Sequence, residues 1–123
     1  MIIQKSSEDY LEAMLMLREE KGYIRSVDVA EKLGVKKPSV SYATKRLRES
    51  GYLTMDEMGL ISLTETGQEI AVRMYTRHKM LAEFLVRIGV DEATAREDAC
   101  RLEHDLSEQS FEAICRYAQE SGK

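Results

Sequence analysis

Apolar residues recur every three or four positions along most of this chain, which is the spacing of amphipathic helices. The first such stretch covers residues 7–21, between Ser7, which can cap a helix, and Gly22, which can end one. Two shorter helices are predicted over residues 27–33 and 39–49, one on each side of a glycine turn. Three helices in close succession are therefore expected in the first half of the chain.

The two short helices carry their own start signals and inner faces. Ser26 can cap the first, and Pro38 stands where the second would begin. The apolar residues expected to hold the pair together are Val27, Ala30, Leu33, Val35, Val40 and Leu47. Packing through these residues would leave the other face of the second helix open to solvent.

Between residues 51 and 64 the pattern changes to short extended runs. The segments 51–55 (GYLTM) and 60–64 (LISLT) predict two strands, and Asp56–Gly59 predicts the turn between them. Helical spacing then returns. Three longer helices are expected, with caps at Thr64 or Thr66, at Asp91 and at Ser107, and with ends near residues 88, 106 and 120.

Helix, short helix, turn, short helix and hairpin is the order of a winged helix-turn-helix, whose second short helix enters the major groove of DNA. Lysine and arginine suit phosphates, while serine and tyrosine suit phosphate oxygens or base edges. The candidate DNA contacts are Arg25, Lys36, Lys37, Pro38, Ser39, Ser41, Tyr42, Lys45 and Arg46. The pattern predicts a DNA-binding unit, and a protein-binding use of the same fold is the alternative.

Charge sharpens this prediction. The chain carries a formal net charge of −4, yet residues 24–48 hold seven Lys or Arg against two acidic residues. A basic segment inside an acidic chain indicates a local DNA footprint, although a solvated helix face would have the same charge. The two cysteines, Cys100 and Cys115, make no disulfide framework, and neither a signal peptide nor a membrane-length apolar run is apparent. We therefore expect a cytoplasmic protein with no membrane partner.

A second unusual feature is the run Cys100-Arg-Leu-Glu103-His104. Positions i, i+3 and i+4 share one face of a helix, so a thiol, a carboxyl and an imidazole project together. This donor set suits iron(II), zinc, cobalt or nickel. Three further candidates are an acidic pair in the first predicted helix and the only other histidine: Asp9, Glu12 and His78. Spacing alone leaves a metal site and a purely structural trio both open.

Several motifs, in order, resemble the diphtheria-toxin-repressor and manganese-transport-regulator family of metal-dependent repressors. They are SEDYLE, YIRSVDVAEKLGV, PSVS, LTETG, RH and CxxEH, and the resemblance covers nearly the whole chain. It implies a mainly α fold with a small β-hairpin: a winged helix-turn-helix over residues 1–64 and a helical dimerisation and metal-binding region over 65–123. It also implies a short form without the SH3-like domain of longer relatives.

The resemblance also implies the function and the ligands. The protein would be a homodimer that represses genes of iron or manganese homeostasis by binding double-stranded operator DNA when Fe(II) or Mn(II) is bound. Zinc, cobalt or nickel could replace these ions in vitro, and no small-molecule substrate is implied. Asp9, Cys100, Glu103 and His104 would bind one ion, and Glu12 and His78 a second, adjacent one. The ion would fix the angle between the two halves and so set the spacing of the recognition helices.

The chain combines features of two branches of that family. Asp9 is the choice of manganese sensors, whereas Cys100 is the choice of iron sensors. Because a soft thiolate disfavours manganese, we expect iron(II) over manganese(II). The wing has Met58-Gly59 in place of the usual arginine, and Arg96 stands where an iron-like ancillary site would have a histidine.

Two other hypotheses stay open at this point. In the first, the chain is a metal-independent winged-helix regulator in which the Cys-Glu-His trio is structural. In the second, it is a small metalloenzyme with an open coordination position. The sequence shows no glycine-rich phosphate loop, nucleophile elbow or base–nucleophile pair. We therefore expect that the chain is not an enzyme.

Overall fold

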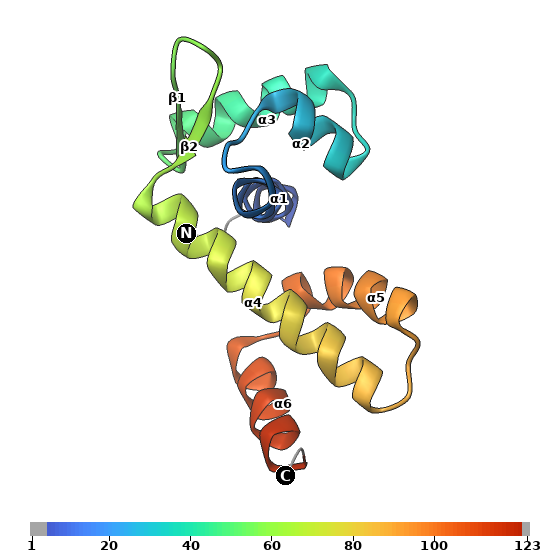
Figure 1. The fold of residues 1–123 in the computed structure, drawn as a ribbon. Helices are drawn as coiled ribbons and strands as arrows, with labels where there is room; N and C mark the ends of the chain where they lie inside the picture. The colour runs from blue at the N-terminus through green and yellow to red at the C-terminus, as the bar shows by residue number, and fades with distance from the viewer. Residues whose placement is uncertain (1–4, 122–123) are drawn as a thin grey trace. The chain divides into compact units, whose positions relative to one another are not determined.

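A computed structural model describes residues 5–121, which form six helices and one β-hairpin (Figure 1). In chain order they are α1 (Lys5–Lys21), α2 (Ser26–Leu33), α3 (Lys37–Glu49), β1 (Leu53–Met55), β2 (Ile61–Leu63), α4 (Glu65–Arg87), α5 (Glu92–Asp105) and α6 (Glu108–Ser121). The predicted fold class is thereby confirmed. The chain forms two compact units, Met1–Arg73 and Met74–Lys123, and the division at residues 64 and 65 stays a prediction. None of the described helices is long and apolar enough to cross a membrane.

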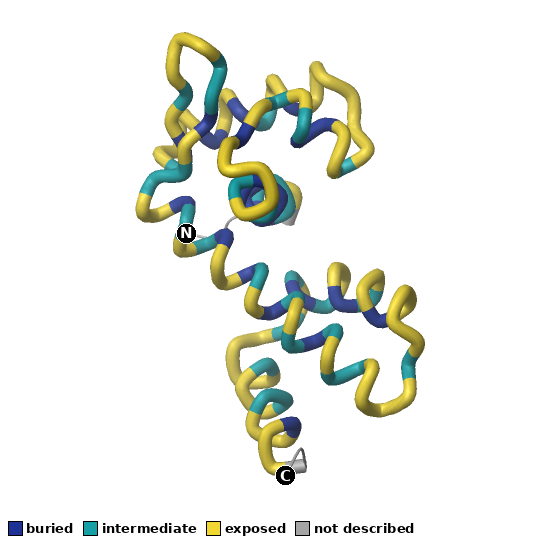
Figure 2. Tube along the Cα trace, in the orientation of Figure 1, coloured by how far each residue is buried: buried dark blue, intermediate teal, exposed yellow. Residues whose placement is uncertain are grey.

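The core of the first unit lies where α1, α2, α3 and the hairpin meet (Figure 2). Its fully buried side chains come from each of these elements: Leu11, Met14, Val29, Val40 and Leu53. The predicted inner face was wrong at two positions. Val35, in the turn after α2, is 37% exposed, and Val27 of α2 is 49% exposed whereas Val29 is 0% exposed. Two residues three positions apart point about 60° away from each other around a helix of 3.6 residues per turn. Val27 therefore lies off the inner face that Val29 and Ala30 occupy.

Three of the predicted helix caps are confirmed. The side-chain oxygens of Thr64, Asp91 and Ser107 each accept a hydrogen bond from the backbone N–H three residues later, at 3.2, 3.0 and 3.1 Å. Ser26, by contrast, is the first residue of α2, and Ser7 lies inside α1. The N-cap of α2 is Arg25, which makes no side-chain cap. Its backbone is extended because it pairs with Leu60 beside the hairpin.

The hairpin is a short antiparallel ribbon in which Leu53 pairs with Leu63 and Met55 with Ile61. Its turn is fixed by Asp56, whose Oδ1 accepts hydrogen bonds from the backbone N–H groups of Met58 and Leu60, both at 2.9 Å. An aspartate in this role is typical of turns, since its short side chain substitutes for a backbone acceptor. The turn therefore has a defined shape and presents the Met58 side chain, which is 81% exposed.

In the second unit, α5 lies beside the portion of α4 from Met74 onward, and side-chain contacts join the two helices (Figure 1). Ala95 and Ala99 on α5 and Met74 and Leu81 on α4 are each no more than 1% exposed. The two alanines are four residues apart and so share one face of α5. Polar side chains of α4 reach α5 beside this apolar face.

Candidate metal centre and DNA interface

Three predicted ligand residues meet on one side of α4 and α5. His78 Nδ1 lies 3.3 Å from Glu103 Oε2 and 3.6 Å from Cys100 Sγ. One donor atom from each residue can be chosen so that all three lie within 4.8 Å of one another. The sequence analysis assigned His78 to a second, adjacent ion. The structure places His78 beside Cys100 and Glu103, and its assignment to one ion or the other stays a prediction.

Burial differs sharply within this cluster. Glu103 is 0% exposed, His78 is half-buried, and Cys100 is exposed. An ionised carboxylate is costly to bury unless positive charge or hydrogen bonds compensate for it. A divalent cation would supply that charge, and nitrogen, sulfur and oxygen donors together suit iron(II), cobalt(II) or zinc. The donor set therefore fits a transition-metal ion.

His104 belongs to the same arrangement. Its side chain is 2% exposed, and its Nε2 lies 3.4 Å from Glu103 Oε1. The two carboxylate oxygens of Glu103 thus face two different imidazoles, His78 through Oε2 and His104 through Oε1. One carboxylate placed in this way can serve one ion or two adjacent ions.

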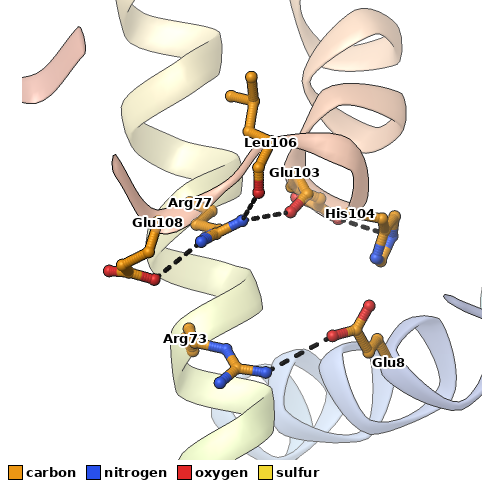
Figure 3. A network of polar contacts seen from close by, with 7 residues as sticks. All are labelled: Glu8, Arg73, Arg77, Glu103, His104, Leu106 and Glu108. Carbon is orange, nitrogen blue, oxygen red and sulfur yellow. Dashed lines mark hydrogen bonds and ion pairs between the residues drawn. The ribbon is translucent and has the colours of Figure 1, made fainter. Parts of the chain in front are cut away.

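The remaining two predicted ligands, Asp9 and Glu12, lie about one turn apart on α1 in the first unit. Asp9 is half-buried and Glu12 is buried. Next to Asp9, the buried Glu8 makes an ion pair of 3.6 Å with Arg73 (Figure 3). Participation of Asp9 and Glu12 in the same ion site as the residues of α5 stays a prediction.

One buried side chain near the cluster was not predicted from the sequence. Arg77, the neighbour of His78 on α4, donates hydrogen bonds to the backbone carbonyls of Glu103 and Leu106 at 3.0 and 2.9 Å (Figure 3). It also donates to Glu108 Oε2 at 2.9 Å. The sequence carried no signal for these contacts beyond the position of an arginine next to a candidate ligand.

The predicted DNA contacts form an exposed surface on α3 and its flanks. Every one of the nine predicted residues is exposed. The guanidinium of Arg46 lies 5.7 Å from the centre of the Tyr42 ring, and that of Arg25 lies 5.5 Å from the Tyr23 ring. Cation–π contacts at these distances orient the arginines without removing their charge from solvent. The surface can therefore present several cations and hydroxyls together.

Two further features lie beside this surface. A cleft of about 450 Å³ separates the start of α1 from α3, and it is lined by hydroxyls of Ser6, Ser7, Tyr10, Ser39 and Tyr42 and by Arg46. Burial raises the pKa of Tyr10 in this cleft. The wing, in contrast, offers Asp56 and Glu57 beside the exposed Met58, so its tip is acidic.

Comparison with known proteins gives a consistent result over the whole chain. Residues 3–59 match the family model described as the iron dependent repressor, N-terminal DNA binding domain. Residues 64–121 match the model described as the iron dependent repressor, metal binding and dimerisation domain. The chain is 41% identical over 109 residues to the HTH-type transcriptional regulator MntR of Bacillus subtilis, a match that covers 89% of this chain and 77% of that protein. It is 37% identical over 114 residues to MntR of Lysinibacillus sphaericus, covering 93% of this chain and 82% of that protein.

Solved structures agree with the sequence relatives. The fold is similar to that of IdeR from T. acidophilum, with a TM-score of 0.80 and 28% identity over 99% of this chain. It is also similar to the manganese regulator SloR, with a TM-score of 0.81 and 29% identity over 97% of this chain. The chain spans 56% and 55% of the lengths of those two structures. On these matches, together with the ligand cluster and the exposed basic helix, the chain belongs to the iron-dependent repressor family of metal-dependent, DNA-binding transcriptional regulators.

Proposed function

We propose that this protein is a homodimeric repressor that binds double-stranded operator DNA when iron(II), or less favourably manganese(II), occupies a site built on Cys100, Glu103, His104 and His78. The observation that carries the proposal is the meeting of a thiol, an imidazole and a fully buried carboxylate within 4.8 Å. In a family of metal-dependent regulators, such a cluster is best explained as the sensing site.

Each ligand residue has a distinct part in the proposal. Glu103 is held in the interior by α5 and faces both histidines, so it is the shared centre of the site. Cys100 is exposed, so an ion could reach its thiol directly from solvent. Asp9 and Glu12 of α1 would complete the coordination, as the family resemblance implies. An ion bound in this way would add further links between the helices that carry its ligands.

The choice of ion follows from Cys100. Thiolate is a soft ligand that favours iron(II), zinc and cobalt(II) over manganese(II), while carboxylates accept all of them. We therefore propose iron(II) as the preferred activator, with manganese(II) as the weaker one and with zinc, cobalt or nickel able to occupy the site in vitro. Its structural relatives include the manganese regulator SloR and ScaR with bound Zn²⁺, so related folds accept more than one ion.

The DNA-binding part of the proposal rests on the exposed face of α3. Lys37, Lys45 and Arg46 would contact phosphates, and Ser39, Ser41 and Tyr42 would contact phosphate oxygens or base edges. Lys36, Pro38 and Arg25 border this face. Because the wing tip is acidic, we propose that α3 and its flanks provide most of the electrostatic attraction to DNA.

The homodimer is supported by the family description and by the surface of the second unit. The matched region is described as a metal binding and dimerisation domain. Val86, Ile88 and Tyr117 are large apolar or aromatic residues left 44, 60 and 61% exposed in the single chain. A second copy could cover such side chains, and a dimer would present two recognition helices to two half-sites. We place this activity in the cytoplasm.

The test is anaerobic binding to the DNA upstream of the protein's own coding sequence, titrated with iron(II) and with manganese(II) against a chelated control. The proposal expects weak binding in chelator and tight binding with iron(II), with manganese(II) needing a higher concentration. Equally tight binding in chelator would support the metal-independent regulator instead. Turnover of a small substrate by the metal-loaded protein without DNA would support the metalloenzyme hypothesis.

A further inference from the structure

Two consecutive residues of α4 hold the same residue of α5 from two sides. Arg77 Nη1 donates to the backbone carbonyl of Glu103 at 3.0 Å, and His78 Nδ1 lies 3.3 Å from the Glu103 side-chain carboxylate. Both the main chain and the side chain of Glu103 are therefore in contact with the same turn of α4. This pairing fixes how far the carboxylate of Glu103 lies from the imidazole of His78.

Arg77 is also tied to the segment that follows α5. The same Nη1 donates to the carbonyl of Leu106 at 2.9 Å, and Nη2 donates to Glu108 Oε2 at 2.9 Å (Figure 3). The guanidinium lies 5.0 Å from the centre of the Phe111 ring on α6. Only 8% of the Arg77 side chain is exposed, so these contacts form in a largely dry environment. One side chain thus connects α4, the end of α5 and the start of α6.

Arginine is suited to this position for two physical reasons. The last carbonyls of a helix have no partner within the helix and carry partial negative charge, which a cation stabilises. The guanidinium also presents several donors in a rigid planar fork, so it can bind two carbonyls and a carboxylate at once. A lysine ammonium is a compact point charge and cannot occupy the three acceptor positions in the same fixed geometry.

We propose that Arg77 is a positioning residue for the ion site, which sets the place of Glu103 relative to His78 and Cys100 and links that place to the docking of α6. This inference rests on the proposed function, because it assumes that the cluster binds an ion. Arg77 does not itself contact the ion. It acts by fixing the position of the end of α5 along α4. The ligand atoms are then preorganised before the ion binds.

The test uses cobalt(II) as the probe, because a thiolate bound to cobalt gives an intense charge-transfer absorption and the visible bands report the coordination geometry. Wild type, Arg77→Met, Arg77→Lys and the control Arg87→Met would be titrated anaerobically, with affinity measured by chelator competition. Arg87 is an exposed arginine of the same helix. We expect Arg77→Met to bind cobalt(II) about 10 to 100 times more weakly, with altered visible bands. Arg77→Lys should recover part of the affinity, and Arg87→Met should match wild type.

A purely structural role for Arg77 predicts a different result. Thermal unfolding of the apo protein would show a lower midpoint, yet the folded fraction of Arg77→Met would bind cobalt(II) with wild-type affinity and spectrum. That result overturns the inference while leaving the proposed function intact. Absence of the thiolate band in wild type would instead overturn the ion site itself and the inference with it.

If Arg77→Met does not fold, less disruptive variants provide the test. Glu108→Gln removes the charge that faces Arg77 Nη2 and keeps the size of the side chain. Because the Glu108 side chain is 64% exposed, the fold should tolerate this change. We expect cobalt(II) affinity to fall by a few-fold in Glu108→Gln and to stay at the wild-type value in the control Glu112→Gln, an exposed glutamate of the same helix. Equal affinities for Glu108→Gln, Arg77→Lys and wild type would refute the inference.

Discussion

The proposed DNA-binding face and the proposed ion cluster are built on opposite principles. The face on α3 comes from one short stretch of sequence, and all of its predicted contacts are exposed. The ion cluster joins His78 of α4 to Cys100 and Glu103 of α5, and its central carboxylate is completely buried. Cations attract a polyanion through solvent and over distance, whereas an ion needs several donors at fixed short distances.

This difference predicts how each region responds to mutation. On the DNA face, the removal of one cation leaves the others in place, so affinity should fall gradually. In the ion cluster, each donor is one of very few, and the loss of one should remove the function. The predictions below test this contrast, beginning with the largest effect.

Replacement of a ligand should abolish the metal response. We expect Cys100→Ala or His104→Ala to leave DNA binding at the level of the chelated wild type at every iron(II) concentration tested, while circular dichroism stays native. Cys115→Ala is the matched control, because burial raises the pKa of this half-buried thiol and it lies on a different helix, α6. A wild-type response to iron(II) in either ligand variant would show that the site is wrongly assigned.

A steric change in the first unit should reduce stability instead. A Cβ at Gly67 would lie 1.9 Å from the backbone oxygen of Tyr52, so the start of α4 or the entry to β1 must shift. We expect Gly67→Ala to lower the free energy of unfolding by about 1–3 kcal/mol, as overpacked sites do. Thr66→Ala is the control, because Thr66 is the exposed neighbour of Gly67. Stability would be measured by chemical denaturation. A Gly67→Ala protein as stable as Thr66→Ala would contradict this packing.

Single cations on α3 should contribute graded effects. Lys37→Ala and Arg46→Ala should each weaken DNA binding and reduce the slope of log affinity against log salt by about 1. Lys32→Ala is the control, since this lysine on α2 is engaged by Glu20 at 3.1 Å. Affinity would be measured at several salt concentrations with saturating iron(II). An unchanged slope in both variants would remove these residues from the phosphate footprint.

The wing offers a gain-of-function test of the same comparison. Met58→Arg places a cation at the exposed tip of the turn fixed by Asp56. We expect tighter DNA binding and a salt slope steeper by about 1, because one more phosphate would be neutralised. Met58→Gln, which adds no charge, should leave the slope unchanged. If Met58→Arg also leaves it unchanged, the wing does not reach the DNA backbone.

The smallest predicted effect concerns pH and the start of α5. Hydrogen bonds from the backbone N–H and the hydroxyl of Thr94 hold the pKa of Asp91 below its ordinary value of 3.8. A depressed carboxyl pKa stabilises the fold above the unfolded-state value, and that contribution is lost as pH falls through the lower folded-state value. Asp91→Asn should therefore weaken the dependence of the unfolding midpoint on pH below about 4. An identical pH profile in Asp91→Asn would show that the cap contributes no such dependence.

Features governed by nearby residues could be predicted from the sequence. The caps at Thr64, Asp91 and Ser107 depend on an N–H three residues away, and the hairpin turn depends on Asp56 and the residues next to it. The grouping of Cys100 with Glu103 follows from helical spacing alone. Each of these needs only the local geometry of a helix or a turn, which the sequence pattern determines directly.

Features that depend on packing between elements could not be predicted in this way. The choice of Val29 over Val27 depends on which side of α2 meets the core, and the apolar pattern allowed either. The approach of His78 to Cys100 depends on the packing of α4 against α5. The contacts of Arg77 could not be predicted, because two of its acceptors are backbone carbonyls, which every residue has.

The central claim is that the ion site and the DNA-binding face are energetically coupled, and the most direct test is the affinity for iron(II) with and without DNA. A duplex would first be selected from a random-sequence pool in the presence of iron(II), and the ion would then be titrated anaerobically by chelator competition. Because coupling is reciprocal, DNA must tighten ion binding by the same factor by which the ion tightens DNA binding. We expect a factor of about 5 to 150. Equal iron(II) affinities in the presence and absence of the duplex would contradict the account.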